Sequence, residues 1–422
     1  MVEIKFVMAV AFVTLVTNSL QAGTGNSSAS QMNSRRDVLN YLLQGNDTDM
    51  YDPRVPPDYE EDHPTKVLIR IHLLSFDSVS ETKMDYSVEI YLTMVWNDSR
   101  LQFEHLNKSP RLEVDWKMMD SVWVPDVYFR NEKEAAFHDV TVPNKFMHLH
   151  PKGNVEYSMR LSLTLSCRML LQKYPLDTQR CPMLIQSYTY TTENVMFYWQ
   201  EGNGVPGPIS YDREIALGTE LPQFSIVENV TESCNGTMDV DTPKFACIKA
   251  HFTMKRDIGY YIIQIYVPGI LIVGLSWVSF WLDLEAIPAR VSLGVLTVLT
   301  LNTHGSHIQS QLPKVSYIKA IDVWSVSSLI FVFAALLEFA YVNVLARRGD
   351  KELRATQVFT MPVENSNKDG GELNGNPHRQ IKIGGPSPSR IRARRIDKIS
   401  RCLFPGLFLL FNIGYWMFYL YM

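Results

Sequence analysis

Residues 288–309, PARVSLGVLTVLTLNTHGSHIQ, constrain the fold more than any other part of this chain. The stretch begins with a proline, which is tolerated at the first position of a helix, and it carries no Asp, Glu, Lys or Arg after Arg290. A helix of about twenty residues spans roughly 30 Å, the hydrocarbon thickness of a bilayer. Its many Ser, Thr, Asn and His residues make it a poor partner for lipid. We therefore expect a membrane-spanning helix that faces protein or water.

Helical spacing gathers some of these side chains into one stripe along the helix. The stripe consists of Ser292, Leu296, Leu299, Thr303, Ser306 and His307. A single stripe encloses nothing, whereas several copies around a symmetry axis would line a water-filled pore. A helix buried inside a monomeric bundle is the alternative, which the flanking sequence disfavours.

Three apolar segments accompany the polar one. We expect membrane-spanning helices over 258–282, 288–309, 316–345 and 399–422. Residues 346–398 are expected to form a disordered loop that ends in a basic helix over 390–401, in contact with anionic lipid. Residues 346–401 hold 13 Lys and Arg against 6 Asp and Glu, a net +7 that leaves −11 for the rest of a chain whose total is −4. This excess of Lys and Arg predicts a cytoplasmic loop and two extracellular termini.

The N-terminal part has the features of a secreted domain. Lys5 precedes an apolar run over 6–16, which predicts a signal peptide over 1–22. All Asn-x-Ser/Thr sequons precede the first apolar span, as expected if only residues 23–257 are extracellular. We expect glycans at Asn26, Asn46, Asn97, Asn229 and Asn235, whereas a proline weakens the sequon at Asn107.

A β pattern dominates residues 23–257, after a short helix expected over 36–44. Alternating or β-rich runs predict strands over 67–74, 86–94, 155–165 and 245–254. The expected fold class is an Ig-like β-sandwich followed by a four-helix transmembrane bundle.

Four of the five cysteines fall within this β region. Cys167 and Cys181 enclose thirteen residues, and Cys234 and Cys247 enclose twelve. Disulfides are the default expectation in a secreted domain. Four cysteines allow three pairings, of which we expect the local one, Cys167 with Cys181 and Cys234 with Cys247.

Other functional classes find little support. The sequence has no HExxH, GxSxG or GxxxxGK pattern, so we expect no enzyme. A cell-adhesion module on a membrane anchor is a remote alternative, because such a module needs one span rather than four.

Several motifs together resemble those of one family. They are a thirteen-residue cysteine loop with Tyr174-Pro-Leu-Asp177, Trp123-Val-Pro-Asp126, Trp277-Val-Ser-Phe-Trp281, Pro288-Ala-Arg290 and Leu312-Pro-Lys-Val-Ser-Tyr317. The chain is similar to subunits of the pentameric Cys-loop receptors from residue 51 to residue 345 and in the last span. It resembles most the anion-selective branch, with its glycine, GABA and invertebrate glutamate-gated channels.

The resemblance implies a subunit of a pentameric chloride channel that opens when a small extracellular agonist binds between subunits. The expected partners are four further subunits, the agonist, chloride and membrane lipid, without a cofactor or nucleic acid. The expected location is the plasma membrane, with a postsynaptic site as one option. The sequence does not name the agonist.

The resemblance also assigns a pore and a coupling path between the domains. The implied pore residues are Pro288, Ala289, Arg290, Ser292, Leu296, Leu299, Thr303 and His307. Five copies of Arg290 would form a ring of positive charge, with a role as membrane-interface anchor as the lesser alternative. Leu299 would be a hydrophobic gate that closes by dewetting. The implied coupling charges are Glu81, Asp177, Arg256 and Lys319.

An aromatic ligand site between subunits is implied as well. Its residues would be Tyr91, Thr93, Ser158 and Arg160 on one subunit, and Tyr128, Phe129, Ser187, Tyr188, Thr242 and Phe245 on the other. Aromatic faces attract a ligand ammonium. Thr93 stands where amino-acid-gated relatives have an arginine, the strongest natural carboxylate anchor. Either Arg130 or Arg160 replaces that arginine, or a partner subunit supplies one, or the agonist is not an amino acid.

Histidines indicate a second mode of control, by protons or zinc. His148 and His150 are two residues apart on a predicted strand, so both point to one face, roughly 6–7 Å apart. Together with His138 they form a candidate zinc site. His307 falls on the pore stripe, where five protonated copies would add positive charge. A proton- or zinc-gated chloride channel of the same fold is therefore the alternative function.

Overall fold

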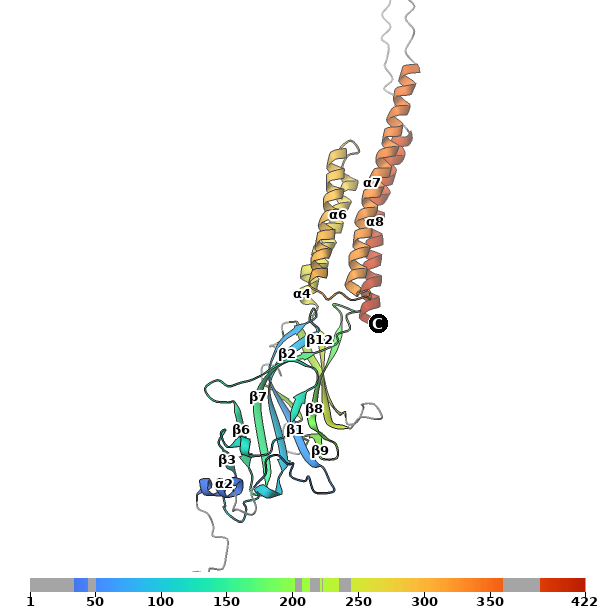
Figure 1. Ribbon diagram of the computed structural model, residues 1–422. Helices are drawn as coiled ribbons and strands as arrows, with labels where there is room; N and C mark the ends of the chain where they lie inside the picture. The colour runs from blue at the N-terminus through green and yellow to red at the C-terminus, as the bar shows by residue number, and fades with distance from the viewer. Residues whose placement is uncertain are drawn as a thin grey trace, which may run out of the picture.

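A β-sandwich and a bundle of long helices are stacked end to end in the computed structural model (Figure 1). The structure describes residues 34–44, 51–201, 207–212, 221, 223–234, 244–359 and 388–421, without the side chains of 44 and 349–359. The expected signal peptide over 1–22, the sequons at Asn26, Asn46 and Asn235, and the expected ligand residue Thr242 lie outside the described residues.

The sandwich is built from two sheets. The strands are β1 (Thr65–Ser80), β2 (Asp85–Asn97), β3 (Leu112–Val114), β4 (Val127–Phe129), β5 (Glu132–Phe137), β6 (Lys145–Leu149), β7 (Asn154–Ser166), β8 (Thr178–Thr191), β9 (Val195–Trp199), β10 (Ile209–Tyr211), β11 (Phe224–Ser233) and β12 (Phe245–Arg256). The larger sheet has the order β10-β1-β2-β7-β6-β3, with β5 paired to β7 and β9 paired to β1. The smaller sheet has the order β11-β12-β8-β4.

The predicted local elements are confirmed with modest changes in length. The four predicted strands lie within β1, β2, β7 and β12, and the predicted short helix is α2 (Arg35–Gln44). Short 3₁₀ turns, η1 (Ser99–Leu101) and η2 (Met119–Ser121), connect the early strands. The expected fold class, a β-sandwich followed by transmembrane helices, is also confirmed.

Aromatic rings join the two sheets in the core. Phe76 on β1 packs against Tyr86 on β2, with ring centroids 5.4 Å apart, and against Phe252 of the opposite sheet at 6.0 Å. Alternation of side chains along each strand directs these residues inward. It directs Glu89 and Tyr91 to the outer face of the larger sheet, where the site described below is found.

The helical region follows directly on β12. Its elements are α4 (Gly259–Tyr261), the π-helical turn η3 (Ile262–Tyr266), α5 (Val267–Trp277), the 3₁₀ turn η4 (Val278–Trp281), α6 (Ile287–Ser310), α7 (Ala320–Phe359) and α8 (Pro388–Tyr421). Among the described residues, three helical segments are long and apolar enough to cross a membrane: Gly259–Trp281, Ala320–Arg348 and Pro388–Tyr421. α6 has the length but not the apolar composition, in keeping with its polar sequence.

Two predicted boundaries in this region are wrong. The third helix begins at Ala320 rather than at residue 316, and it continues to Phe359. α8 begins at Pro388, so the loop expected to be disordered over 346–398 is helical at both ends. The predicted basic helix over 390–401 is confirmed as the first part of α8. Apolar length alone underestimates these helices, because charged turns continue them beyond the span.

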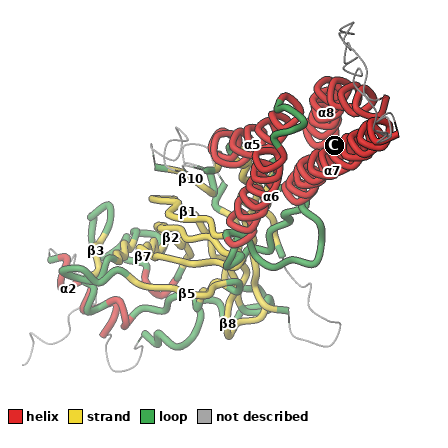
Figure 2. Tube along the Cα trace, turned by 90° about the horizontal axis from the view of Figure 1, so that it is seen from above, coloured by secondary structure: helices red, strands yellow, loops and turns green. Residues whose placement is uncertain are grey.

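The helices pack around a small core of their own. Figure 2 shows α5, α6, α7 and α8 gathered into one cluster. Each of these helices contributes one residue to the core, namely Val273, Leu301, Val332 and Phe408. Gly294 of α6 allows close approach to α7, since a Cβ atom there would lie 2.5 Å from Leu336 Cδ1. One side of α6 is thereby held against the bundle, and the opposite side stays exposed.

Candidate functional site: coupling junction, pore helix and ligand face

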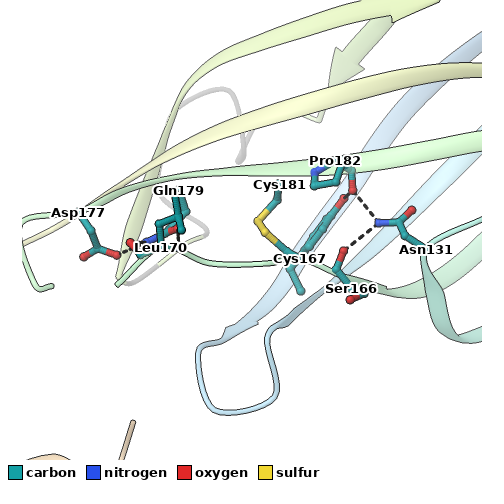
Figure 3. Close-up of a disulfide and its surroundings, with 9 residues drawn as sticks. Asn131, Ser166, Cys167, Leu170, Asp177, Gln179, Cys181 and Pro182 are labelled. Atoms are coloured by element: carbon teal, nitrogen blue, oxygen red, sulfur yellow. Dashed lines mark hydrogen bonds between the residues drawn. A yellow bond between two sulfur atoms is a disulfide. The ribbon is translucent and has the colours of Figure 1, made fainter. Parts of the chain in front are cut away.

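The disulfide Cys167–Cys181 closes the loop between β7 and β8 (Figure 3). Asn131 Nδ2 donates to the carbonyls of Ser166 and Pro182, each at 2.9 Å, so one amide holds a neighbour of each cysteine. Sequence reasoning missed Asn131, because no motif marks this amide. The second expected disulfide, Cys234–Cys247, is also confirmed.

The cysteine loop is joined to α7 by backbone hydrogen bonds. Ala320 and Ile321, in the first turn of α7, donate their N–H groups to the carbonyls of Gln172 and Tyr174, at 2.9 and 3.1 Å. The first N–H groups of a helix have no acceptor within the helix. The loop supplies those acceptors, so a displacement of the loop acts on the end of α7.

Arg256 forms the centre of a charged cluster beneath this loop. Its side chain is fully buried, and it donates from Nε and Nη2 to the carboxylate of Asp177 at 2.8 and 3.1 Å. Nη1 donates to Glu81 in the β1–β2 turn and to the Tyr261 hydroxyl at the start of the first span. Three of the four predicted coupling charges therefore meet at one point between the sandwich and the helices.

Aromatic rings surround the same guanidinium. The Arg256 Cζ atom lies 4.4 Å from the Phe224 ring centroid and 4.7 Å from that of Tyr174, at cation–π distance. Burial alone would lower the pKa of Arg256, but its hydrogen bonds to Asp177 and the charge of that carboxylate raise it overall. Burial also raises the pKa of Tyr174. The cluster thus contains a permanent cation and an un-ionised phenol.

The fourth predicted coupling charge, Lys319, lies elsewhere. Its Nζ is 3.0 Å from the carboxylate of Asp322 on the same helix turn, and it makes no ion pair with Asp177. A nearly buried ammonium needs a partner, and Asp322 is the nearest along its own helix. The α6 side is instead reached by Thr82, whose hydroxyl donates to Gln311 O at 3.1 Å. Lys319 therefore lies outside this cluster, and its coupling role stays a prediction.

Most of the predicted pore residues lie on the exposed side of α6. They are Pro288, Ala289, Ser292, Leu296, Leu299, Thr303 and His307. Leu296 and Leu299 are 58 % and 57 % exposed, whereas Thr297 and Leu301 face the bundle and are buried. The stripe on α6 has no covering element among the described residues of this chain.

Arg290 departs from the prediction for the pore. Its side chain is 1 % exposed, and its two terminal nitrogens donate to Asp397 of α8 at 2.8 and 3.3 Å. Nη2 also donates to the carbonyl of Leu282. A buried guanidinium requires a counter-charge, and α8 provides it. The expected ring of uncompensated positive charge at Arg290 is therefore wrong, and sequence reasoning missed Asp397.

One half of the predicted ligand site contains a partly exposed aromatic pair. The rings of Tyr128 on β4 and Tyr188 on β8 meet edge to face, with centroids 5.5 Å apart, and Tyr188 is 75 % exposed. Phe129 and Ser187 are buried instead, so neither can line an open site. Alternation along β4 turns Phe129 into the core, and Ser187 Oγ is held by Asp126 at 2.6 Å. The partly buried Phe245 begins β12.

The other half lies on the outer face of the larger sheet. Strand register aligns His72, Tyr91 and Arg160 in one cross-strand row. The next row aligns Arg70, Thr93 and Ser158, with Thr93 Oγ1 and Ser158 Oγ 3.0 Å apart and buried.

Two rows of this face place basic side chains around the predicted ligand residues. Arg160 is held by Glu89 through hydrogen bonding, and His72 stacks on Tyr91 at 6.3 Å between centroids. Arg70 lies directly opposite Thr93, the position without the expected arginine. Sequence reasoning missed Arg70 and His72, because strand register was not available to it.

The predicted zinc trio is not assembled. His148 Nδ1 and His150 Nε2 lie 3.7 and 3.9 Å from the carboxylate of Glu156, as their shared face predicts. His138 instead contacts Glu89 and Ser162. Ser162 is six residues from Glu156 along β7, about 20 Å for an extended strand. Membership of His138 in this site is therefore wrong.

A different trio comes together before β1. Asp58, Glu61 and His63 each offer one ligand atom, and these atoms all lie within 4.8 Å of one another. The spacing Asp-x-x-Glu-x-His was a signal in the sequence that went unused. Asn97 and Asn229, the described members of the predicted glycan set, use their amides internally, toward Asn154 and Tyr211.

An agonist-type face on a β-sandwich, a charged junction and a polar helix among apolar ones define a ligand-gated membrane channel. Comparison with known families agrees. Residues 35–258 match the neurotransmitter-gated ion-channel ligand binding domain, and residues 265–364 match the neurotransmitter-gated ion-channel transmembrane region. The chain belongs to the neurotransmitter-gated ion channels, the Cys-loop receptor family. It is a subunit of a ligand-gated channel and not an enzyme.

Proposed function

We propose that the chain is a subunit of a pentameric chloride channel in the plasma membrane, opened by a small agonist that binds between subunits. The β-sandwich and both termini lie outside the cell, which accounts for two disulfides in the sandwich. The observation that carries the proposal is the exposed stripe of α6, which holds hydroxyl groups, leucines and His307 but no acidic side chain. Five stripes around an axis make a wet pore with a dry constriction at Leu296 and Leu299.

The preference for anions is also attributed to α6, but to its N-terminus rather than to the charge of Arg290. Because Asp397 neutralises Arg290, a ring of free guanidinium groups is not its source. The N-terminus of α6 at Ile287 carries the positive end of the helix dipole. Five such ends, without an opposing carboxylate at Pro288 or Ala289, favour an anion at this mouth of the pore.

Reversal potentials test this assignment. Agonist-evoked current is recorded in cells that express the full chain, alone or with related subunits. Its reversal potential should shift with the chloride gradient and not with the sodium gradient. Ala289→Glu places a ring of carboxylates at the mouth and should shift permeability toward cations. Ala289→Gln, of the same size without charge, is the matched control and should keep chloride selectivity. A reversal potential that follows sodium in the unmodified channel contradicts the proposal.

The agonist class is proposed from the outer face of the larger sheet. Arg70, His72 and Arg160 surround Tyr91, which supplies an aromatic face, so this half favours a ligand with an acidic group. Arg70 would anchor the acidic group of the ligand, which the uncharged Thr93 cannot do. Arg70→Gln should then raise the half-maximal concentration for an acidic agonist more than Arg180→Gln, a surface control on β8. An equal response of both variants would exclude Arg70 as the anchor.

A second function, modulation by protons or zinc, is favoured by Glu156. This carboxylate is approached by His148, His150 and Arg70 at 3.6–3.9 Å. Protonation of either imidazole competes with Arg70 for Glu156 and leaves the guanidinium freer for a ligand. The two imidazoles with Glu156 also offer zinc ligands, without His138.

A further inference from the structure

An open cavity lies beside the loop that joins the first span to α6. Figure 1 shows this loop at the end of the helices remote from the β-sandwich. Its volume is about 470 Å³. The lining residues come from this loop and from the first turns of α8: Trp281, Leu282, Asp283, Leu284, Arg394, Asp397, Lys398 and Arg401. Neither the proposed pore nor the proposed agonist site uses this cavity.

Three cations of α8 face the cavity together. Arg394, Lys398 and Arg401 are separated by four and three residues, which places them on one side of a helix. Arg394 and Lys398 are exposed, and neither forms an ion pair with any described residue. Arg401 is partly buried, donates from Nε to Phe280 O at 3.0 Å and lies over the Trp281 ring at 4.5 Å. One of the three cations is thus fixed and two are free to meet a ligand.

The acidic residues of the wall do not cancel this charge. Asp397 accepts two hydrogen bonds from Arg290, so a cation outside the cavity neutralises it. Asp283 is exposed and accepts a hydrogen bond from the N–H of Leu284 at 2.7 Å. The cavity therefore retains a net positive charge and suits a ligand with more than one negative charge.

The position of the cavity relative to the membrane selects the ligand. Trp281 ends the first span and is 67 % exposed, as is typical of a tryptophan at a membrane interface. Immediately after Arg401, α8 exposes a run of apolar side chains that includes Leu403, Leu407 and Leu410. The cavity thus lies at the level of lipid headgroups, next to a helix surface that suits acyl chains.

We propose that this cavity binds the headgroup of an anionic lipid with more than one phosphate, in the leaflet remote from the β-sandwich. Arg394 and Lys398 contact the phosphates, and Arg401 with Trp281 forms the floor. Basic pockets between membrane helices on the cytoplasmic side recognise such headgroups. Asp397 is a wall of the cavity and the partner of Arg290, so headgroup occupancy reaches the first turn of α6. The site goes beyond the proposed function and needs no assumption about its agonist.

The test is lipid binding to the purified full chain in phosphatidylcholine nanodiscs, with native mass spectrometry to count bound lipid. Phosphatidylinositol bisphosphate should remain bound, and phosphatidylserine should bind much less. Arg394→Gln/Lys398→Gln should reduce binding by roughly thirtyfold, since each Lys or Arg near an anionic headgroup is worth about fivefold. Arg392→Gln/Arg395→Gln, which removes the same charge from exposed positions outside the cavity, should change it little.

Two results would overturn the proposal. Equal losses in both double variants would show attraction to the charged surface of α8 rather than to the cavity. Binding of soluble inositol trisphosphate as tight as that of the lipid would show a site for free phosphates and not for a membrane lipid. Both measurements are independent of conduction, so a failure of the chloride-channel proposal would leave this test unaffected.

Discussion

Two buried arginines, one at each end of the transmembrane bundle, differ in how completely they are bound. Arg256 at the junction with the sandwich uses Nε, Nη1 and Nη2 for two carboxylates and a hydroxyl. Arg290 at the remote end has one carboxylate, Asp397, and one carbonyl, and its Nε has no partner among the described residues. All three nitrogens of Arg256 have partners, an arrangement that we call saturated, whereas Nε of Arg290 has none among the described residues.

The surroundings of Arg256 are also more closed than those of Arg290. Arg256 lies against three aromatic rings, with Cζ-to-centroid distances of 4.4–5.6 Å. Arg290 has Phe339 at 6.0 Å, and its partner Asp397 lines an open cavity. A buried charge in a saturated, dry site has no substitute for a lost partner. At the remote end, water from the cavity can solvate Asp397 if its pair with Arg290 breaks, so this end suits regulation. The junction around Arg256 instead suits rigid transmission of movement from the sandwich to the helices.

The largest effect is therefore expected at the junction. Arg256→Ala leaves Asp177 buried without its cation and should destabilise the fold by about 3–5 kcal/mol. Little protein should reach the cell surface, and unfolding of the solubilised full chain should occur at lower temperature. Arg180→Ala, in an exposed pair with Glu232, is the control and should behave like the parent. Normal surface expression of Arg256→Ala would contradict a saturated junction.

The two disulfides provide the next comparison. Each closes a loop of about fifteen residues, so each should stabilise by roughly 3 kcal/mol on the chain-entropy model. The functional results should differ, because the loop of Cys167–Cys181 bonds to α7. Cys167→Ser should abolish assembled channels, whereas Cys234→Ser should permit assembly with altered agonist sensitivity. Surface biotinylation and native gels distinguish these outcomes. Similar assembly of both variants would contradict a specific need for the Cys167–Cys181 disulfide in assembly.

At the remote end, Asp397→Asn should have a smaller effect than Arg256→Ala. Asparagine keeps an acceptor for Arg290, and the adjacent cavity admits water, so we expect a loss of about 1–3 kcal/mol. The double variant Arg290→Gln/Asp397→Asn should recover part of it, as a double-mutant cycle would measure. Chloride selectivity should survive in both. A loss of selectivity in Arg290→Gln alone would restore the guanidinium as a direct determinant of the pore.

This remote end also shows where sequence reasoning fails. The strands and apolar spans could be predicted, because side-chain alternation and apolar length are local patterns. The partner of Arg290 could not, since Asp397 is 107 residues further along the chain, in a basic helix that was expected to contact lipid. Long-range charge pairing leaves no periodic signal. The ion pair of Lys319 with Asp322, three residues further on, likewise left no signal that the sequence reasoning used.

Register explains the errors at the ligand face. β1 and β2 form a hairpin that pairs Ser80 with Asp85, and an unbroken ladder from there would place His72 opposite Thr93. Two register shifts in β1 place Arg70 there instead. Bulges insert a residue without an obligatory sequence mark. The residue types of this face were therefore visible in the sequence, but their neighbours were not.

The smallest predicted effect lies on this face, far from both buried arginines. Zinc bound by His148, His150 and Glu156 would compete with Arg70 for the carboxylate, so Glu156 would hold Arg70 less tightly. An acidic agonist should then bind more tightly in micromolar zinc. Partly exposed pairs are worth less than about 1 kcal/mol, so the half-maximal concentration should fall by at most about fivefold.

His148→Ala/His150→Ala should remove this zinc dependence, because it depends on the two imidazoles that share Glu156. His63→Ala is the matched control: His63 also lies beside a glutamate, Glu61, but belongs to the separate trio before β1. Concentration–response curves at several pH values, with and without micromolar zinc, distinguish the two sites. Loss of zinc sensitivity in His63→Ala alone would assign zinc to that trio. Unchanged zinc dependence in the double variant would leave the imidazoles beside Glu156 with a structural role, and regulation would then reside at the less saturated end of the transmembrane bundle.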